Sequence, residues 1–288
     1  MRLIKGRQCF AGAVLRRGNA LAVLAAGFAA AFFSLSGAAA QESAWAGIDE
    51  AQVRLISGVT STGESATLPL GLEFALADDW KVYWRSPGDA GFPPRLDWNG
   101  SKNFQSAEIS WPAPERFSVL GFETVGYHDA VVLPLAVTLD EPGGAAELAL
   151  SVDYLACQEI CVPVTAKLAL MVPGGPGGPS QFASRIEDYR NKIPDDGTRH
   201  GLSIDSATAR SGSKGTVLEV AARAENGFSS PDLFVEGPER IYFGVPKVTL
   251  ARNGHEAVLT LSAVTASGGA PDLAGAVHHT ILELCRSS

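Results

Sequence analysis

The segment Ser151-Val-Asp-Tyr-Leu-Ala-Cys-Gln-Glu-Ile-Cys-Val-Pro-Val-Thr-Ala-Lys-Leu-Ala-Leu170 alternates apolar and polar residues in the manner of two β-strands. Such alternation predicts strands that bury one face. Three residues separate Cys157 from Cys161 in the turn between the two runs. The segment therefore predicts a β-rich fold and holds two thiols within reach of each other.

A cysteine pair this close is suited to thiol–disulfide exchange. A disulfide across so short a loop restrains little of the unfolded chain, because the entropy that it removes grows with loop length. Each thiol stays within reach of its partner, which favours reversible opening and closing. A local structural disulfide is the alternative that the residues alone leave open.

The N-terminus predicts export. An apolar run over residues 20–35 is followed by small residues at 37–40. Five basic residues precede the run: Arg2, Lys5, Arg7, Arg16 and Arg17. This order is typical of a secretory signal, here residues 1–40, cleaved after Ala40. An uncleaved membrane anchor is the alternative, but the apolar run is shorter than the ~20 residues that span a bilayer. We therefore expect a bacterial periplasmic location, where disulfides persist, without membrane insertion after cleavage.

The charge of the chain excludes some classes of partner. Without residues 1–40 the chain has 18 basic and 31 acidic residues, a formal charge of −13. A chain this acidic does not attract nucleic acid or anionic lipid. Three cysteines remain after cleavage, so at least one has no partner within the monomer. Cys285, four residues from the end, is expected to be an incidental thiol.

Short β-like runs punctuated by Gly, Pro, Asn and Asp continue along the chain. They are Gln52–Ile56, Thr67–Leu76, Lys81–Arg85, Ala107–Trp111, Ala130–Thr138, Ala146–Tyr154 and Val162–Val172. About seven short strands with turn signals between them predict an all-β sandwich over residues 41–172.

The second half of the chain predicts three further features. Pro173–Ser180, rich in Pro and Gly, predicts a linker. A helix is expected over Ser180–Lys192, with Ser180 as its N-cap and with Phe182, Ile186 and Tyr189 on one face. Linker and helix together occupy residues 173–200. Beyond them a second, smaller β-sandwich is expected over residues 201–288, with strands at Thr216–Ala222, Ile241–Leu250 and Ala257–Ala263.

Several motifs follow one another in the order found in a known family. They are Asp79-Trp-Lys-Val-Tyr-Trp-Arg-Ser-Pro-Gly-Asp-Ala-Gly-Phe-Pro-Pro94, Ile109-Ser-Trp-Pro-Ala-Pro-Glu-Arg-Phe117, Gly126-Tyr-His-Asp-Ala-Val-Val-Leu-Pro134 and the segment of Cys157 and Cys161. Over residues 45–172 the chain resembles the amino-terminal periplasmic region of the DsbD family of thiol–disulfide interchange proteins. The resemblance is nearest to the ScsB branch, which is associated with copper tolerance. A weaker similarity extends to Asp232-Leu-Phe-Val-Glu-Gly-Pro238.

The resemblance implies an immunoglobulin-like fold with a redox-active pair at Cys157 and Cys161. It also implies a capping loop near residues 117–122 that shields the oxidised pair; Phe117, Leu120 and Phe122 are its apolar members, and Phe122 is the expected ring. The implied partners are thioredoxin-like periplasmic proteins or a DsbD-like membrane reductase, and no cofactor is implied. The sequence contains no thioredoxin-like CxxC motif, so partners are expected to complete the electron relay.

Few residues in the sequence are placed to activate the pair. Glu159 lies between the cysteines and opposes ionisation of the thiols, whereas Lys167 and His128 are the nearest positive or titratable side chains. His128 and Tyr154 are the possible auxiliary residues. An aromatic cluster is expected to form core rather than a ligand platform: Trp80, Tyr83, Trp84, Trp98 and Trp111.

No metal site is expected from the sequence. His278 and His279 are adjacent, so on a strand they would point to opposite faces. Only Met171 remains as a methionine after cleavage, which argues against a copper site built from soft ligands.

The prediction from the residues and the resemblance together is a periplasmic thiol–disulfide exchange module. It would pass reducing equivalents between a thioredoxin-like partner and oxidised periplasmic proteins, as a component of a protein-disulfide reductase. Two alternatives stay open: a non-catalytic binding or adaptor sandwich with a structural disulfide, and a periplasmic copper-binding protein.

Overall fold

The structure, a computed structural model, describes residues 41–119, 121–212, 215–236, 241–265, 269–271, 273 and 279–285. The predicted signal segment, residues 1–40, lies outside them. Antiparallel sheets account for most of the described residues, which confirms the predicted all-β class. No helix among the described residues is long and apolar enough to cross a bilayer.

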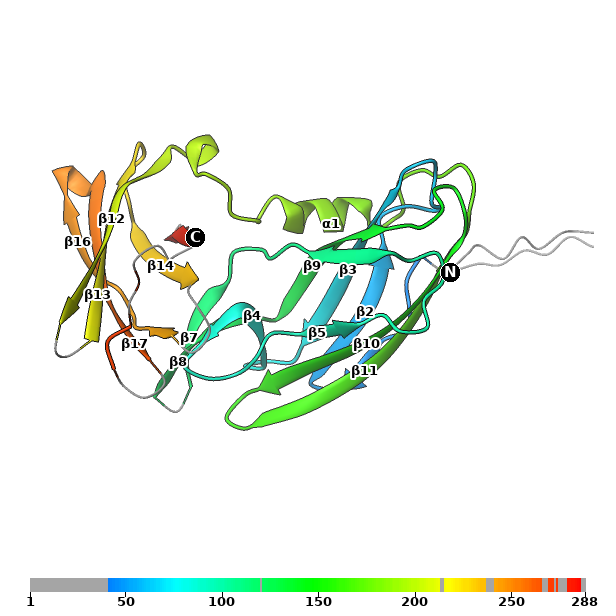
Figure 1. Cartoon of the computed structure of the whole chain (residues 1–288), viewed down its shortest axis with the longest axis horizontal. Coiled ribbons are helices and arrows are strands. Elements are labelled where there is room, and N and C mark those ends of the chain that lie inside the picture. Colours follow the sequence, from blue (N-terminus) through cyan, green and yellow to red (C-terminus); the bar gives the residue numbers. More distant parts are fainter. Residues whose placement is uncertain are drawn as a thin grey trace, which may run out of the picture. The chain divides into compact units, whose positions relative to one another are not determined.

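Two antiparallel sheets form the first sandwich (Figure 1). One sheet has the order β1-β2-β3-β9-β6, with strands Ala46–Ile48, Ala51–Ser57, Thr67–Leu76, Ala130–Thr138 and Ser106–Ile109. The other has the order β11-β10-β4-β8-β7, with strands Cys161–Val172, Ala146–Cys157, Lys81–Gly88, Phe122–His128 and Glu115–Val119; β5 (Arg95–Asp97) also pairs with β10.

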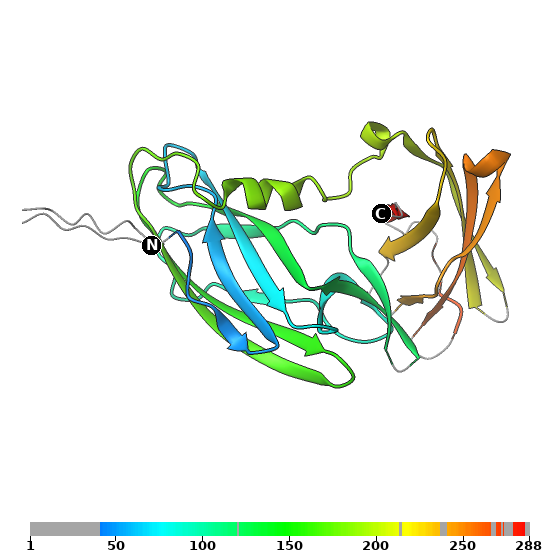
Figure 2. The same ribbon diagram turned by 180° about the vertical axis from the view of Figure 1, so that it is seen from behind.

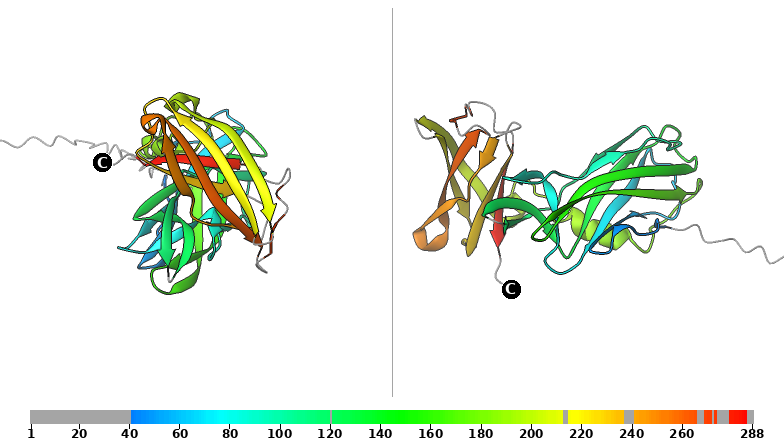
Figure 3. Two further views of the ribbon diagram at one scale, coloured as in Figure 1. Left: turned by 90° about the vertical axis from the view of Figure 1, so that its left-hand side faces the viewer. Right: turned by 90° about the horizontal axis from the view of Figure 1, so that it is seen from below.

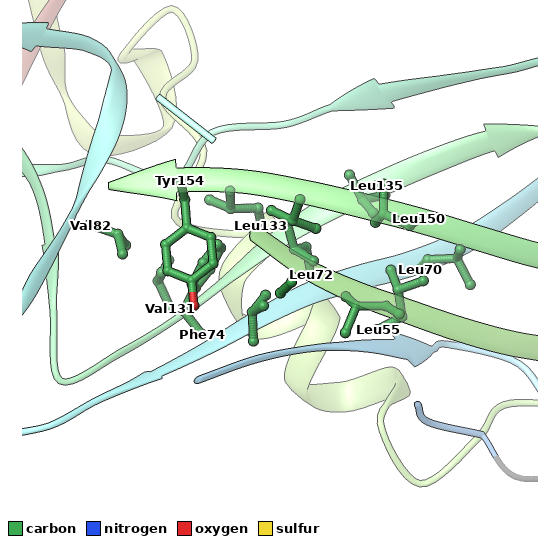
Figure 4. Packing of buried hydrophobic residues seen from close by; sticks show 14 of the residues in the cluster. Leu55, Leu70, Leu72, Phe74, Val82, Val131, Leu133, Leu135, Leu150 and Tyr154 are labelled. Carbon is green, nitrogen blue, oxygen red and sulfur yellow. The ribbon is translucent and has the colours of Figure 1, made fainter. Parts of the chain in front are cut away.

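The core of this sandwich follows from the alternation in its strands. Along β10, every second residue from Ala146 to Ala156 is buried, and the residues between them are mostly part-exposed or exposed. Figure 4 shows leucines of β2 and β3, among them Leu55 and Leu72, facing Leu150 of β10. Each such leucine contributes about 1.5–3 kcal/mol when it is removed from water. The same pattern therefore selects the strands and fills the space between the sheets.

Helix α1 (Ala183–Arg190) covers the outer face of the first sheet (Figure 2). Phe182 and Ile186 are buried there against Ile56 and Val132, with Tyr189 partly buried beside them. The expected apolar face of the helix is thus confirmed. Gly71 of β3 allows the close approach, because a Cβ at this position would lie 2.6 Å from Cγ1 of Val132 and 3.2 Å from Cγ1 of Ile186.

The expected N-cap is wrong. Helix α1 begins at Ala183 with Phe182 as its N-cap, and no side chain caps it. Ser180 instead ties the chain to the end of β2: its hydroxyl donates to the carbonyl of Ser57 (2.5 Å) and accepts from the backbone N–H of Phe182 (2.9 Å). The helix begins three residues later than predicted because this anchor holds residues 180–182 outside it, and it ends at Arg190 rather than at Lys192.

The Pro/Gly stretch before the helix is bonded to the first sandwich rather than free. Backbone N–H groups of Thr60, Thr62 and Gly63 donate to carbonyls within residues 173–178, at distances of 2.9–3.0 Å. Residues 173–180 therefore run along the loop that follows β2. The boundaries set at residues 173 and 200 remain a prediction.

A second pair of sheets follows (Figure 3). The larger sheet has the order β12-β13-β17-β15, with β16 also on β17; its strands are Leu202–Gly212, Gly215–Ala224, Glu256–Thr265, Ile241–Phe243 and Lys247–Ala251. The smaller sheet pairs β14 (Ser230–Glu236) with β18 (His279–Cys285). Two short 3-10 helices, Thr198–His200 and Arg252–Gly254, complete the elements.

The single strand expected over Ile241–Leu250 is wrong. Residues 244–246 are not part of a strand, and Pro246 has no N–H to donate to a ladder. β15 consequently pairs with residues 263–265 of β17, whereas β16 pairs with residues 256–260.

Candidate functional site

The site begins at the end of the β10–β11 hairpin. The register runs from Ala146↔Val172 to Cys157↔Cys161, so the two cysteines form the last pair of the ladder. They are joined by a disulfide. Gln158, Glu159 and Ile160 form the turn between them, and Ile160 is 77% exposed.

The two sulfur-bearing residues differ in access to solvent. Cys157 is fully buried, whereas Cys161 is exposed. Exchange proceeds by attack of a thiolate on one sulfur of a disulfide, so access decides which sulfur is attacked. The geometry leaves Cys161 open to a partner and places Cys157 in the position of the leaving group.

Tyr83 of β4 holds the buried sulfur. Its hydroxyl donates to Sγ of Cys157 at 3.0 Å and lies 3.6 Å from Sγ of Cys161. The residue is 2% exposed, and burial raises the pKa of its phenol, so the hydroxyl stays protonated and able to donate. The sequence had suggested only a core role for Tyr83.

Gly91 allows the loop after β4 to pack directly against the ring of Tyr83. It has φ +95°, and a Cβ there would collide with three atoms of the Tyr83 ring. A side chain at this position would force the loop after β4 away from the ring. The glycine therefore lets backbone close the outer side of Tyr83.

Strand register gathers more side chains on the same face of the sheet as Cys157. Lys81 pairs with Cys157 on one side and with His128 of β8 on the other. Directly opposed residues in neighbouring strands project to the same face. Phe117 of β7 reaches this group, since its ring centroid lies 5.9 Å from that of His128 and 5.4 Å from Nζ of Lys81. The cation beside the pair is therefore Lys81, and Lys167, which pairs with Ser151, lies six residues along β11 from Cys161.

His128 lies between two carboxylates. Its Nε2 is 2.7 Å from Glu115 and its Nδ1 is 2.7 Å from Asp129. Burial lowers the pKa of His128, but hydrogen bonds and charge from Glu115 and Asp129 together outweigh burial and raise the pKa above its usual value. The charge of this group is thus set by neighbours on β7 and at the end of β8.

Comparison with known proteins agrees with this geometry. Residues 56–173 match the family described as thiol:disulfide interchange protein DsbD, N-terminal. This part of the chain is a DsbD-family amino-terminal domain. Residues 192–282 match a domain of unknown function (DUF8393). No curated protein is significantly similar in sequence.

A solved structure carries the likeness further along the chain. The N-terminal periplasmic domain of ScsB from Proteus mirabilis is 25% identical and superposes with a TM-score of 0.64. The match covers 81% of this chain and 88% of that structure. The predicted resemblance of this DsbD-family domain to ScsB is thereby confirmed.

The segment expected to cap the pair is part of a β-hairpin in the DsbD-family domain. Strands β7 and β8 pair from Glu115↔Gly126 to Val119↔Phe122. Phe122 is 53% exposed, so it is not core; Leu120 lies outside the described residues. His128, opposite Lys81, is six residues from Phe122, about 20 Å along a strand. Phe117, through its contacts with His128 and Lys81, is the aromatic ring of the hairpin nearer to the cysteine pair by register.

Tyr154 has a structural position rather than an auxiliary one. It belongs to the residues of β10 that face the core, on the opposite side of the sheet from Cys157. Its hydroxyl donates to the carbonyl of Ala51, and its ring meets Phe74 edge-on at 5.2 Å between centroids. Figure 4 shows this ring among the buried residues of the sandwich.

The described residues contain no group of three or more His, Cys, Asp and Glu side chains that could hold a metal ion. His278 lies outside these residues, and the backbones of His279 and Cys285 belong to β18.

Of the residues that carry the site, Tyr83 and Lys81 are those that reasoning from the sequence missed. The alternation of Lys81–Arg85 could have placed Tyr83 on the opposite face from Val82 and Trp84, which are buried in the core. It could not have shown that this face meets Cys157, because the pairing of β4 with β10 joins residues 76 positions apart.

Proposed function

We propose that the chain is a periplasmic thiol–disulfide exchange module that acts through Cys157 and Cys161. The observation that carries the proposal is the asymmetry of the pair: Cys161 is exposed, while Cys157 is buried and accepts a hydrogen bond from Tyr83. An accessible sulfur beside a stabilised leaving group is what exchange requires. A purely structural disulfide needs neither feature.

The exchange step follows from these positions. A thiolate of the partner attacks Sγ of Cys161, a mixed disulfide forms, and the bond between Cys161 and Cys157 breaks. Cys157 leaves as a thiolate, and the hydroxyl of Tyr83 donates to it. The partner's second thiolate then attacks the partner sulfur that is bonded to Cys161. A disulfide forms within the partner, and Cys161 is released as a thiolate. The partner is oxidised by two electrons, and the module is reduced by the same two electrons.

The partners proposed for this step are thioredoxin-like periplasmic proteins or a DsbD-like membrane reductase. In the reverse direction the reduced module would reduce oxidised periplasmic proteins by the same route. Support for the periplasm comes from the likeness to a periplasmic domain of ScsB and from the signal-like segment at residues 1–40.

We also propose that the β7–β8 hairpin shields the oxidised pair on the side of Cys157, while Cys161 stays exposed. Phe117 supports this role through its contacts with Lys81 and His128. Phe122, exposed near the tip, would reach the pair only if the tip folds toward β10.

Trapping of the mixed disulfide tests the exchange function. In the chain from Gln41 with Cys285→Ser, the variant Cys157→Ser should accumulate a mixed disulfide with an oxidised thioredoxin-like partner, because the resolving thiol is missing. Cys161→Ser, which keeps only the buried sulfur, should trap far less. Non-reducing gels and intact mass give the readout.

Two outcomes would contradict the proposal. One is equal trapping by Cys161→Ser, which would remove the asymmetry of the pair from the mechanism. The other is an absence of any mixed disulfide in the Cys157→Ser variant, which would favour a structural disulfide.

A further inference from the structure

Strand β14 of the second sandwich contributes to the core of the first. Phe234 is 3% exposed and belongs to the apolar cluster of the first sandwich, with its ring 6.3 Å from that of Trp84 of β4. Its neighbours Leu233 and Val235 belong instead to the core of the second sandwich. The period of two along a strand explains this division, because successive side chains point to opposite faces.

Polar contacts flank Phe234 on the same face of β14. Arg116 of β7 donates from Nε to Asp232 at 2.9 Å and from Nη2 to the same carboxylate at 3.0 Å. Nη2 also donates to the carbonyl of Leu233 at 3.1 Å, and the guanidinium lies 5.0 Å from the centroid of the Phe234 ring. Further along, Arg85 of β4 pairs with Glu236.

The ion pair of Arg116 is well placed to hold its strand. Both side chains are largely shielded, at 14% and 21% exposure. A two-bond fork between guanidinium and carboxylate fixes orientation as well as distance. β7 is an edge strand of its sheet and, among the described strands, pairs only with β8. Asp232 and Phe234 hold this edge strand from a second direction.

Arg116 lies between two residues that contact the redox site. Glu115 pairs with His128, and the ring of Phe117 contacts His128 and Lys81. Successive residues of a strand project to opposite faces. Arg116, on one face of β7, is therefore held by β14. Phe117, on the other face, contacts Lys81 of β4, the residue that pairs with Cys157.

We propose that β14 clamps the β7–β8 hairpin and thereby sets how readily the Cys157–Cys161 disulfide is reached. Arg116 and Asp232 are positioning residues in this device, and Phe234 is its apolar anchor. The inference rests on the proposed exchange function and gives the second sandwich, a domain of unknown function, a part in it. Cys161 is already exposed, so release of the clamp would act on the buried side of the pair: the hairpin would move away from Lys81 more often and widen the approach of thiols to the disulfide.

Reduction of the disulfide by dithiothreitol in the full chain tests the clamp. Asp232→Asn keeps the size of the side chain and removes its charge, so it should speed reduction about fivefold, the rate equivalent of ~1 kcal/mol lost from the closed hairpin. Hydrogen exchange of the amides of residues 117–125 should quicken in the same variant. Neither readout would change if the ion pair only stabilised the second sandwich.

A matched control comes from the same sandwich. Asp205 pairs with Arg223 at 2.7 Å, away from the hairpin, so Asp205→Asn should leave the reduction rate unchanged. A double-mutant cycle with Arg116→Gln and Asp232→Asn should be non-additive, because either change alone already breaks the fork. Arg116→Lys, which keeps the charge but loses the fork, is the milder variant should Asp232→Asn not fold.

A reduction rate in Asp232→Asn equal to that of the wild type would overturn the clamp, as would the same acceleration in Asp205→Asn. The test uses a small thiol and no partner protein. Its failure is thus separate from failure of the trapping experiment, which would remove the exchange function itself.

Discussion

At the scale of single residues, Tyr83 differs from the other buried tyrosines because its hydroxyl lies beside a sulfur of the disulfide. The same chemical group serves two purposes in this chain: Tyr154 donates its hydroxyl to a backbone carbonyl in the core, and Tyr83 donates to a sulfur of the disulfide. Burial raises the pKa of both phenols, that of Tyr154 to about 12, so both remain donors at neutral pH. Only the hydrogen bond of Tyr83 strengthens when its acceptor becomes a thiolate.

Tyr83→Phe is therefore expected to slow reduction of the disulfide about tenfold, the rate equivalent of ~1.4 kcal/mol lost from a hydrogen bond to a charged group. The ring stays, so packing under Gly91 is kept. Reduction by dithiothreitol, followed by thiol titration, gives the rate. Tyr154→Phe is the matched control, since it should lower stability and leave the rate unchanged. Equal rates for Tyr83→Phe and the wild type would remove Tyr83 from the mechanism.

His128 supplies a prediction on pH. Its pKa is raised in the folded state by Glu115 and Asp129, so protonation favours folding. The stability that it contributes is fully present below the unfolded pKa of about 6.5. It is lost as pH rises through the higher folded value.

NMR titration should therefore give His128 a pKa above that of a free histidine, and Glu115→Gln should lower it. The free energy of unfolding should fall across the same pH window in the wild type and less in His128→Gln. A pKa of His128 below 6.5 in the folded chain would show that burial outweighs the carboxylates.

At the scale of elements, helix α1 and the β7–β8 hairpin are attached to different sheets. Helix α1 is held by Phe182 and Ile186 against the outer face of β3 and β9, on the sheet without the cysteines. The hairpin belongs to the sheet with the cysteines. Stability and exchange should accordingly respond to different substitutions.

Ile186→Ala is expected to cost ~2–4 kcal/mol of unfolding free energy, because the side chain is 3% exposed and fills the space above Gly71. The rate of disulfide reduction should stay at the wild-type value in conditions where the variant is folded. Asp188→Ala, exposed on the same helix, should change stability by less than about 0.5 kcal/mol. Denaturant unfolding measures both variants, and equal stability of Ile186→Ala and Asp188→Ala would show that α1 is not packed on the sheet.

At the scale of the whole described chain, two cores are joined by one strand. β14 gives Leu233 and Val235 to the core of the second sandwich and Phe234 to that of the first. The match to the DsbD amino-terminal family ends at residue 173, whereas the likeness to the ScsB structure covers 81% of the chain. The β7–β8 hairpin and the second sandwich are accordingly parts of one arrangement.

The sequence by itself determined several apolar runs bounded by turn residues, and the place of the cysteine pair. Thr67–Leu76 and Ala130–Thr138 were predicted with the bounds that β3 and β9 have. These features are local, because a short run of apolar and β-branched residues between turn residues indicates a strand whatever it later packs against. Other strands lack such a signal: β12 is exposed along almost its whole length, and residues 117–122, expected as a loop, form the tip of the β7–β8 hairpin.

Only the tertiary structure decided which distant residues meet. The bond from Tyr83 to Cys157 joins residues 74 positions apart, and that from Arg116 to Asp232 joins residues 116 positions apart. Ser180 is expected from sequence as a helix cap, but its hydroxyl donates to the carbonyl of Ser57, 123 residues away. Such contacts depend on strand order and register, which are set by how all the strands pack together and not by any one segment of the chain.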